Sequence, residues 1–354
     1  MKIALLGAGG FIGSHLVEGL LAWSDHTVEG MDLTGEKLEE ITAALAPSAR
    51  KRWTFHEADI RQAPDLVRSM VRGADVVVDL IAHANPSLYV TRPLDVFELN
   101  FMQNLEVARL CIAHRAWLIQ YSSAEVYGKA SGTPYAEDET DAVFGPVSKQ
   151  RWIYAVGKHL LERVLYAHGE AGELTYTIVR PFNFLGPRID YLVPPGATGG
   201  PRVFPHFMSA LLGGGPMRLV DGGHAHRAFL HAADGTAAFR AILEQPERAR
   251  NAIFNVGNPG NDTSIRDLAL LMLELYEELT GEPPRSPIED ISGEAFYGAG
   301  YEDSDREVPN ITKIRSLGWA PTHDLRTTVR DTMSHYLRAA GRPVIEARAP
   351  AERG

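Results

Sequence analysis

Short apolar runs alternate with segments of helical periodicity over the first half of the chain. The run at 74–82 is apolar almost throughout, which is typical of a strand buried on both faces of a sheet. The predicted strands cover residues 2–6, 27–32, 74–82, 117–122 and 176–180, and the predicted helices cover 11–23, 94–114 and 153–167. Strands that alternate with helices form parallel sheets with right-handed crossovers. The predicted fold class is therefore α/β, a doubly wound, Rossmann-like parallel sheet.

The second half of the chain has a different pattern. Residues 190–201 are rich in Pro and Gly and predict a loop, whereas the spacing over 264–278 predicts a helix. We expect a sheet domain over 1–182 and a smaller C-terminal lobe over 183–340, with part of 224–260 packing against the sheet domain. Residues 341–354 predict a flexible tail.

Composition narrows the possible partners. The chain has 354 residues and a formal net charge of −10, which argues against a general nucleic-acid binder. The single cysteine, Cys111, allows no intrachain disulfide and fits a reducing, cytoplasmic compartment. The absence of an apolar run of 18 residues argues against membrane insertion. The first predicted strand starts at Lys2, which leaves no room for a signal peptide.

A glycine turn joins the first predicted strand to the first helix. Gly7, Gly10 and Gly13 have the spacing GxxGxxG, and Phe11 and Ile12 open the helix. Glycines permit a tight turn and a close backbone approach, and the helix N-terminus offers free N–H groups to a pyrophosphate. The strand before the turn and the helix after it make the motif specific. The sequence therefore predicts a dinucleotide site.

The residue at the end of the second predicted strand distinguishes NAD from NADP. Asp32 lies there, where a carboxylate can accept both ribose hydroxyls of NAD and would repel the 2′-phosphate of NADP. Leu33 follows, so no adjacent arginine offsets that repulsion. Asp59 and Ile60 follow the third strand, and we expect them to contact the adenine. NAD is therefore the expected cofactor, and no metal is expected.

A second motif supplies groups for hydride transfer. Tyr154 and Lys158 form a YxxxK pair on one face of a predicted helix. An ammonium beside a phenol lowers the pKa of the phenol, which would let Tyr154 act as a base. Ser123 follows the strand predicted over 117–122 and supplies a third group. Together the three residues could grip one hydroxyl while hydride leaves its carbon.

With these motifs, the chain is identified as a member of the extended short-chain dehydrogenases/reductases, the NAD-dependent epimerase/dehydratase family. Within that family it resembles UDP-apiose/UDP-xylose synthases and the UDP-glucuronate decarboxylases of bacterial polymyxin resistance. The resemblance runs along nearly the whole chain. The matching segments are GAGGFIGSHL at 7–16, RPLDVFELNF at 92–101, SSAEVYG at 122–128, KQRWIYAVGK at 149–158, IVRPFNFLGPRID at 178–190, RLVDGG at 218–223, IFNVGNP at 253–259 and FYGAGYEDSD at 296–305.

The resemblance implies a UDP-sugar substrate held mainly by the C-terminal lobe. The implied substrate-binding residues are Tyr89, Arg151, Asn183, Arg202, Arg218, Arg227 and Tyr301. Asn183 and Arg227 would hold the diphosphate, and Tyr301 would close over the sugar. Arginines suit this task because their guanidinium groups bind phosphate in a fork. Relatives also pair the helices at 94–114 and 153–167 in a four-helix interface, so a homodimer is expected.

Glu125 is the informative acid, because a glutamate at this place assists chemistry at sugar C5 and C6 in these relatives. Three features depart from their pattern. Ala84 and Ala124 stand where the apiose-forming enzymes carry two cysteines, and Ala124 also replaces a serine of the decarboxylases. Glu307 stands where the decarboxylases carry an arginine, and Arg306, one position earlier, could take over that task.

Three functional hypotheses follow from these residues. The first is a UDP-glucuronate decarboxylase that makes a UDP-4-keto-pentose or UDP-xylose, favoured by Glu125 and the overall resemblance. The second is a UDP-sugar 4-epimerase, favoured by Ala124 and Glu307. The third is a catalytically silent NAD-binding protein, against which the intact Ser123, Tyr154 and Lys158 argue.

Overall fold

A seven-stranded parallel sheet forms the centre of the chain in the computed structural model, which describes all residues except 133, 195–196, 198–199, 201 and 346–354. The strand order is β11-β6-β5-β4-β1-β2-β3. The strands are β1 Lys2–Leu6, β2 Thr27–Asp32, β3 Trp53–Glu57, β4 Val76–Asp79, β5 Trp117–Tyr121, β6 Tyr176–Pro181 and β11 Ala252–Val256. The order reverses between β1 and β4, and in doubly wound sheets ligands bind at such a reversal.

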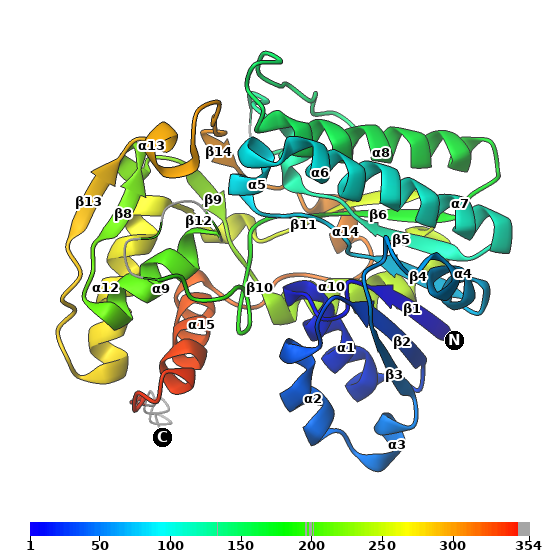
Figure 1. The fold of residues 1–354 in the computed structure, drawn as a ribbon, viewed down its shortest axis with the longest axis horizontal. Helices are drawn as coiled ribbons and strands as arrows, with labels where there is room; N and C mark the ends of the chain where they lie inside the picture. Colours follow the sequence, from blue (N-terminus) through cyan, green and yellow to red (C-terminus); the bar gives the residue numbers. More distant parts are fainter. Residues whose placement is uncertain (133, 195–196, 198–199, 201, 346–354) are drawn as a thin grey trace.

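Helices cover both faces of this sheet (Figure 1). Side chains alternate across β1: Ile3 and Leu5 belong to the core cluster of α1 and α10, and Ala4 and Leu6 to the cluster of α4, α7 and α8. The helices of this part are α1 Phe11–Trp23, α2 Glu39–Ala44, α3 Pro47–Arg50, α4 Pro64–Arg72, α5 Pro86–Thr91, α6 Pro93–Phe97, α7 Asn104–His114, α8 Trp152–Glu170, α10 Ala232–Glu244, α11 Pro246–Ala249 and α14 Thr312–Arg315, with short helical turns at Glu36–Leu38 and Ala124–Tyr127. The doubly wound α/β prediction is confirmed.

Two predicted elements differ in extent. The helix expected over 94–114 is divided into α6, a π-helical segment at Glu98–Gln103 and α7. Asn100 and Asn104 lie at this widened turn, and their amides hydrogen-bond the backbone of the loop after β4. The strand expected over 74–82 covers only β4, because the chain then turns and the Asp79 carboxylate accepts a bond from the Ile81 amide at 2.9 Å.

The C-terminal lobe packs small sheets against helices. Its strands are β7 Phe184–Leu185, β8 Met217–Val220, β9 His226–Ala228, β10 Leu230–His231, β12 Asp262–Ser264, β13 Ile288–Ile291 and β14 Arg306–Glu307. Its helices are α9 Val203–Gly213, α12 Ile265–Thr280, α13 Gly293–Tyr297 and α15 Leu325–Ala339, with short turns at Asp221–Gly223 and Pro259–Asn261. The helix α12 confirms the one predicted over 264–278.

The chain returns to the main sheet after it has entered the C-terminal lobe. The strand β11 pairs with β6 at the edge of the sheet, and α10 packs against α1. Parts of the predicted loop at 190–201 and of the predicted tail at 341–354 lie outside the described residues. Within the described ranges, no helix has both the length and the apolar character that crossing a bilayer requires.

Candidate active site

A cavity of about 580 Å³ lies at the carboxyl ends of the central strands, where the C-terminal lobe meets the sheet. Segments that follow β1, β4, β5 and β6 line one side, and α9, β8, β9 and the segment before β14 line the other. Its lining includes the predicted residues Ile12, Tyr89, Ser123, Glu125, Arg151, Tyr154, Lys158, Asn183, Arg202, Arg218, Arg227 and Tyr301. Residues predicted from separate motifs therefore share one enclosed space.

The glycine turn after β1 has the geometry that a pyrophosphate requires. Gly7 adopts a φ of +90°, which side chains disfavour, and a Cβ atom on Gly13 would lie 2.0 Å from the Gly7 carbonyl oxygen. Gly10 caps α1 without a side chain, so Phe11 and Ile12 begin the helix with free N–H groups. The backbone at the start of α1 can therefore approach an anion closely.

Asp32 lies beside this turn at the end of β2. Its carboxylate accepts a hydrogen bond from the Leu33 amide at 2.7 Å, and burial raises the pKa of the carboxyl above its ordinary value. At the end of β3, Asp59 forms an ion pair with Arg61 at 2.9 Å, and Ile60 is buried. Their predicted contact with adenine stays a prediction.

Tyr154 and Lys158 lie one turn apart near the start of α8, with Ser123 opposite them after β5. The ring of Tyr154 stacks on that of Tyr89, with centroids 4.4 Å apart. Lys158 donates from Nζ to the carbonyl oxygen of Tyr121 at 3.0 Å. Tyr89, Tyr154 and Lys158 are buried, so the surrounding protein and not water sets their ionisation.

The predicted lowering of the Tyr154 pKa is wrong. Burial raises the pKa of this phenol, and so does the nearby Glu125 carboxylate, while the hydroxyls of Ser123 and Tyr89 act in the opposite direction. Burial also lowers the pKa of Lys158 to about 8, although the charges of Asp79 and Glu162 oppose the change. The Lys158 ammonium donates to the backbone carbonyl of Tyr121.

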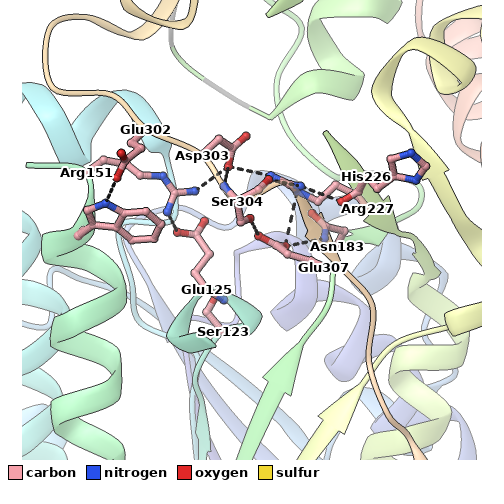
Figure 2. A network of polar contacts seen from close by, with 11 residues as sticks. Ser123, Glu125, Arg151, Asn183, His226, Arg227, Glu302, Asp303, Ser304 and Glu307 are labelled. Carbon is pink, nitrogen blue, oxygen red and sulfur yellow. Dashed lines mark hydrogen bonds and ion pairs between the residues drawn. The ribbon is translucent and has the colours of Figure 1, made fainter. Parts of the chain in front are cut away.

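A chain of ion pairs crosses the cavity above Ser123 (Figure 2). Arg151 donates to Glu125 at 2.9 Å and to Asp303 at 3.1 Å. Arg227 donates to the same oxygen of Asp303 at 2.7 Å and lies 3.6 Å from Glu307. Three carboxylates thus meet two guanidinium groups, and Asp303 bridges the two arginines.

The charged groups of this ion-pair network shift one another's pKa values. Burial raises the pKa of Glu125, with Arg151 opposing it, whereas Arg227 and Arg151 outweigh burial and lower the pKa of Asp303. Glu307 is buried and accepts hydrogen bonds from the Ser304 hydroxyl and, at 3.3 Å, from the Asn183 amide. Asn183 therefore contacts an acid and Arg227 is paired with acids, although both were predicted to hold the diphosphate.

The structure does not bring Arg306 into the cavity. Its side chain is 54% exposed and forms an ion pair with Asp262. Arg306 and Glu307 are successive residues of β14, and successive side chains of a strand point to opposite faces. Glu307 consequently faces the cavity and Arg306 faces away, so the expected contact between Arg306 and a substrate carboxylate is wrong for this conformation.

Sequence reasoning missed several residues of the cavity. Asp303 and Ser304 lie inside the matched segment at 296–305, yet nothing local marks either one as a partner of an arginine. His206 of α9 also lines the cavity and lies in no matched segment, and Phe296 and Tyr297 of α13 open the matched segment but were given no role. Arg202, which was predicted, forms an ion pair with Asp190 at 3.0 Å.

Comparisons with known proteins agree with this geometry. The family model described as "NAD dependent epimerase/dehydratase family" matches residues 3–257. The chain belongs to this family. Its relatives include the UDP-D-apiose/UDP-D-xylose synthase of Oryza sativa subsp. japonica, 39% identical over 99% of this chain and 93% of the relative. The UDP-D-apiose/UDP-D-xylose synthase 1 of Arabidopsis thaliana is also 39% identical, over 98% of this chain and 94% of its own length.

Solved structures of the epimerase/dehydratase family share the fold. The PbgP3 protein from Burkholderia pseudomallei superposes with a TM-score of 0.84 at 34% identity, covering 96% of this chain and 97% of that one. A UDP-glucuronic acid 4-epimerase from Bacillus cereus, solved with UDP-glucuronic acid and NAD, superposes with a TM-score of 0.78 at 21% identity, covering 96% of this chain and 100% of that one.

NAD is the cofactor of this family, and the residues present here fit it. The N-terminus of α1 with Gly10 and Gly13 would hold the pyrophosphate, because no side chain covers its N–H groups. Asp32 would accept the ribose hydroxyls, and Ile12 and Leu80 line the cavity that leads to Tyr154. The chain is therefore an NAD-dependent enzyme that modifies nucleotide sugars.

Proposed function

We propose that this chain oxidises a UDP-hexuronic acid at C4 and releases its C6 carboxylate as CO2, which gives a UDP-4-keto-pentose or, after reduction, UDP-xylose. The observation that carries the proposal is the placement of Glu125 and Arg151 beside Ser123 and Tyr154 in one cavity. Groups suited to chemistry at C6 thus lie next to groups suited to oxidation at C4.

The roles of the chain's own residues follow from their positions. Ser123 and Tyr154 would hold the C4 hydroxyl, and Tyr154 would take its proton. Lys158 would support the charge of the phenolate, since it remains mainly cationic below its pKa of about 8. NAD, when bound, supplies the acceptor for the C4 hydride. The resulting ketone lies β to the carboxylate and can accept the electrons of the C5–C6 bond as CO2 leaves.

The names of the synthase relatives, which give UDP-apiose and UDP-xylose, support a UDP-pentose product, and two positions of this chain narrow it. The resemblance to apiose-forming enzymes implies two active-site cysteines, and this chain has Ala84 and Ala124 at those places. Both alanines line the cavity. Because a methyl group can neither donate nor accept a proton, we propose a xylose-type or 4-keto product without ring contraction.

A UDP-sugar 4-epimerase remains the second candidate, and Glu307 is the observation that favours it. A buried carboxylate in the cavity repels a uronate carboxylate, whereas epimerisation needs only oxidation, rotation of the keto sugar and reduction from the other face. Arg227 lies 3.6 Å from Glu307 and offsets part of that repulsion, so we keep decarboxylation as the first candidate.

We also propose that the enzyme acts as a cytoplasmic homodimer. Five large apolar side chains on α6, α8 and the π-helical segment between α6 and α7 are exposed, namely Leu94, Met102, Val156, Leu160 and Tyr166. Such a face on adjacent helices suits a four-helix interface. Cys111, the single cysteine, is buried, which suits a reducing compartment.

Incubation of the protein with UDP-glucuronate and NAD tests the proposal. Mass spectrometry should detect CO2 together with a UDP-pentose or its 4-keto form. Conversion of UDP-glucuronate to UDP-galacturonate without CO2 would instead support the epimerase.

A further inference from the structure

Asp303 occupies the space between two buried cations. One of its oxygens accepts hydrogen bonds from Arg151 at 3.1 Å and from Arg227 at 2.7 Å, and from the amide of Ser304 at 2.9 Å. A contact with the side chain of Tyr301 adds to these. The side chain of Asp303 is 31% exposed, whereas those of Arg151 and Arg227 are 4% and 10% exposed. The acid is thus the accessible member of the cluster.

The segment that carries Asp303 is free of regular structure. It runs from the end of α13 at Tyr297 to the start of β14 at Arg306. Gly298 and Gly300 adopt φ values of +107° and +88°, a backbone conformation that favours glycine, and neither position carries a side chain. Ser304 stays attached, since its carbonyl oxygen accepts from Arg227 and its hydroxyl donates to Glu307. A rotation of the Asp303 side chain therefore requires no movement of β14.

The other two acids of the cluster are less exposed than Asp303, and neither is ion-paired with both arginines. Glu307 is 5% exposed and has hydrogen bonds from Ser304 and Asn183 besides Arg227 nearby. Glu125 belongs to the helical turn that follows Ser123 and is paired with Arg151. Asp303 alone of the three bridges the two arginines, and it is the most exposed, so a ligand carboxylate could replace its bonds while its own carboxylate turns to water.

The position of the cluster suits the C6 group of a sugar. In the proposed function the C4 hydroxyl lies at Ser123 and Tyr154, and C6 is attached to C5, the neighbour of C4. Figure 2 shows Glu125 extending from the turn at Ser123 to Arg151, with Asp303 beyond. A carboxylate on C6 would therefore meet the two arginines and the acid between them.

We propose that Asp303 fills an anion site and that the carboxylate of a UDP-hexuronic acid takes its place between Arg151 and Arg227. This inference rests on the proposed function and names the group that selects the uronate. It assigns Arg227 to the C6 carboxylate, in place of the diphosphate contact that the resemblance implied for this residue. Charge balance is its physical basis. The cluster holds the carboxylates of Glu125, Asp303 and Glu307 against two guanidinium groups. Exchange of Asp303 for a substrate carboxylate keeps this balance, whereas addition without exchange would bring a fourth carboxylate to two cations.

The exchange is tested by ligand binding in a Tyr154→Phe background, which prevents turnover. Dissociation constants for UDP-glucuronate and UDP-glucose are measured by calorimetry, without and with Asp303→Asn. Removal of the competing carboxylate should strengthen binding of UDP-glucuronate by about tenfold relative to UDP-glucose. Glu302→Gln is the matched control, because it removes the same charge from the neighbouring residue, whose partners are Trp152 and Lys129. The control should leave the ratio of the two constants within about twofold.

Two results would overturn the proposal. One is an equal change for both ligands in Asp303→Asn, and the other is a gain no larger than in Glu302→Gln. Asp303→Ser serves as a second variant with the same expected preference, and thermal melting shows whether each variant folds. If neither folds, a crystal structure of the unmodified protein with UDP-glucuronate decides, and Asp303 still between the two arginines would overturn the exchange. Release of CO2 is measured separately from binding. The expected binding preference of Asp303→Asn can therefore fail while CO2 is released, and it can hold while no CO2 is released.

Discussion

Arg151 donates from Nη1 to a carboxylate oxygen of Glu125 at 2.9 Å, and this pair ties the turn after β5 to the start of α8. Ser123 lies two residues before Glu125, and Tyr154 lies three residues after Arg151. The pair therefore links the acid suited to chemistry at C6 with the groups suited to oxidation at C4.

The activity should fall as the pH rises through about 8. Burial lowers the pKa of Lys158 to about 8 from an ordinary 10.5, so its ammonium is present below that pH and lost above it. Without that charge the Tyr154 phenolate is less stable, and kcat/KM for oxidation should decline. A pH profile checks this, and a rate that keeps rising through pH 9.5 would contradict it.

The same shift affects stability with a defined sign. Between about pH 8 and 10.5 the unfolded chain carries a proton on Lys158 that the folded chain lacks. The contribution of this group to the free energy of unfolding should therefore rise with pH over that window. Denaturant titrations at the two ends of this pH window measure the free energy of unfolding. Lys158→Met is the control, because it removes the contribution of this group.

Asp32 should set the preference for NAD over NADP. Asp32→Ala removes the carboxylate that would repel a 2′-phosphate, and the ratio of the two dissociation constants should narrow by about tenfold or more. Asp59→Ala is the control, because Asp59 is paired with Arg61 and should leave the ratio unchanged. Equal affinity of the unmodified protein for both cofactors, measured by calorimetry, would refute the role of Asp32.

Substitutions of Arg306 and of Glu307 should differ in their effect on the binding of UDP-glucuronate. Arg306→Ala should change the dissociation constant by less than about twofold, because exposed ion pairs contribute little. Two carboxylates about 4 Å apart repel each other by roughly 4 kcal/mol at an effective dielectric of about 20. Arg227 offsets part of this repulsion. Glu307→Gln should therefore strengthen the binding of UDP-glucuronate, relative to that of UDP-glucose, by about tenfold. A severe loss in Arg306→Ala would show that its side chain reaches the ligand after all.

The protein should be a homodimer at micromolar concentration, as measured by light scattering. Leu160→Glu places a charge on the exposed apolar face of α8, where Leu160 is 44% exposed, and should give monomers. Leu270→Glu on α12, where the leucine is 50% exposed, makes the same change on the C-terminal lobe and should leave the dimer intact. A monomer in the unmodified protein would end this part of the account.

The sequence predicted those parts of the site whose signals are local. The glycine turn, Asp32 and the pair of Tyr154 and Lys158 each lie within one strand, turn or helix, where spacing determines geometry. Glu125 was found through the resemblance and lies in the cavity as expected.

The remaining features depend on long-range packing. Arg306 and Glu307 occupy a strand of only two residues, so alternation alone could not decide which one faces inward before the pairing of β14 with β9 was known. Asp303 meets Arg151 and Arg227 across 152 and 76 residues of sequence. The pKa of Tyr154 was predicted in the wrong direction because burial, which spacing does not reveal, raises it.

UDP-glucuronate labelled with ¹³C at C6 provides the most direct measurement. With NAD present, the account predicts ¹³CO2 and an unlabelled UDP-pentose or 4-keto-pentose in equal amounts. Tyr154→Phe should release ¹³CO2 more slowly by a factor of about 10² to 10⁴, because the proton acceptor is lost. The variant should still bind the UDP-sugar, because the ring still packs against Tyr89. Recovery of all the label in UDP-glucuronate or in its 4-epimer would contradict the account.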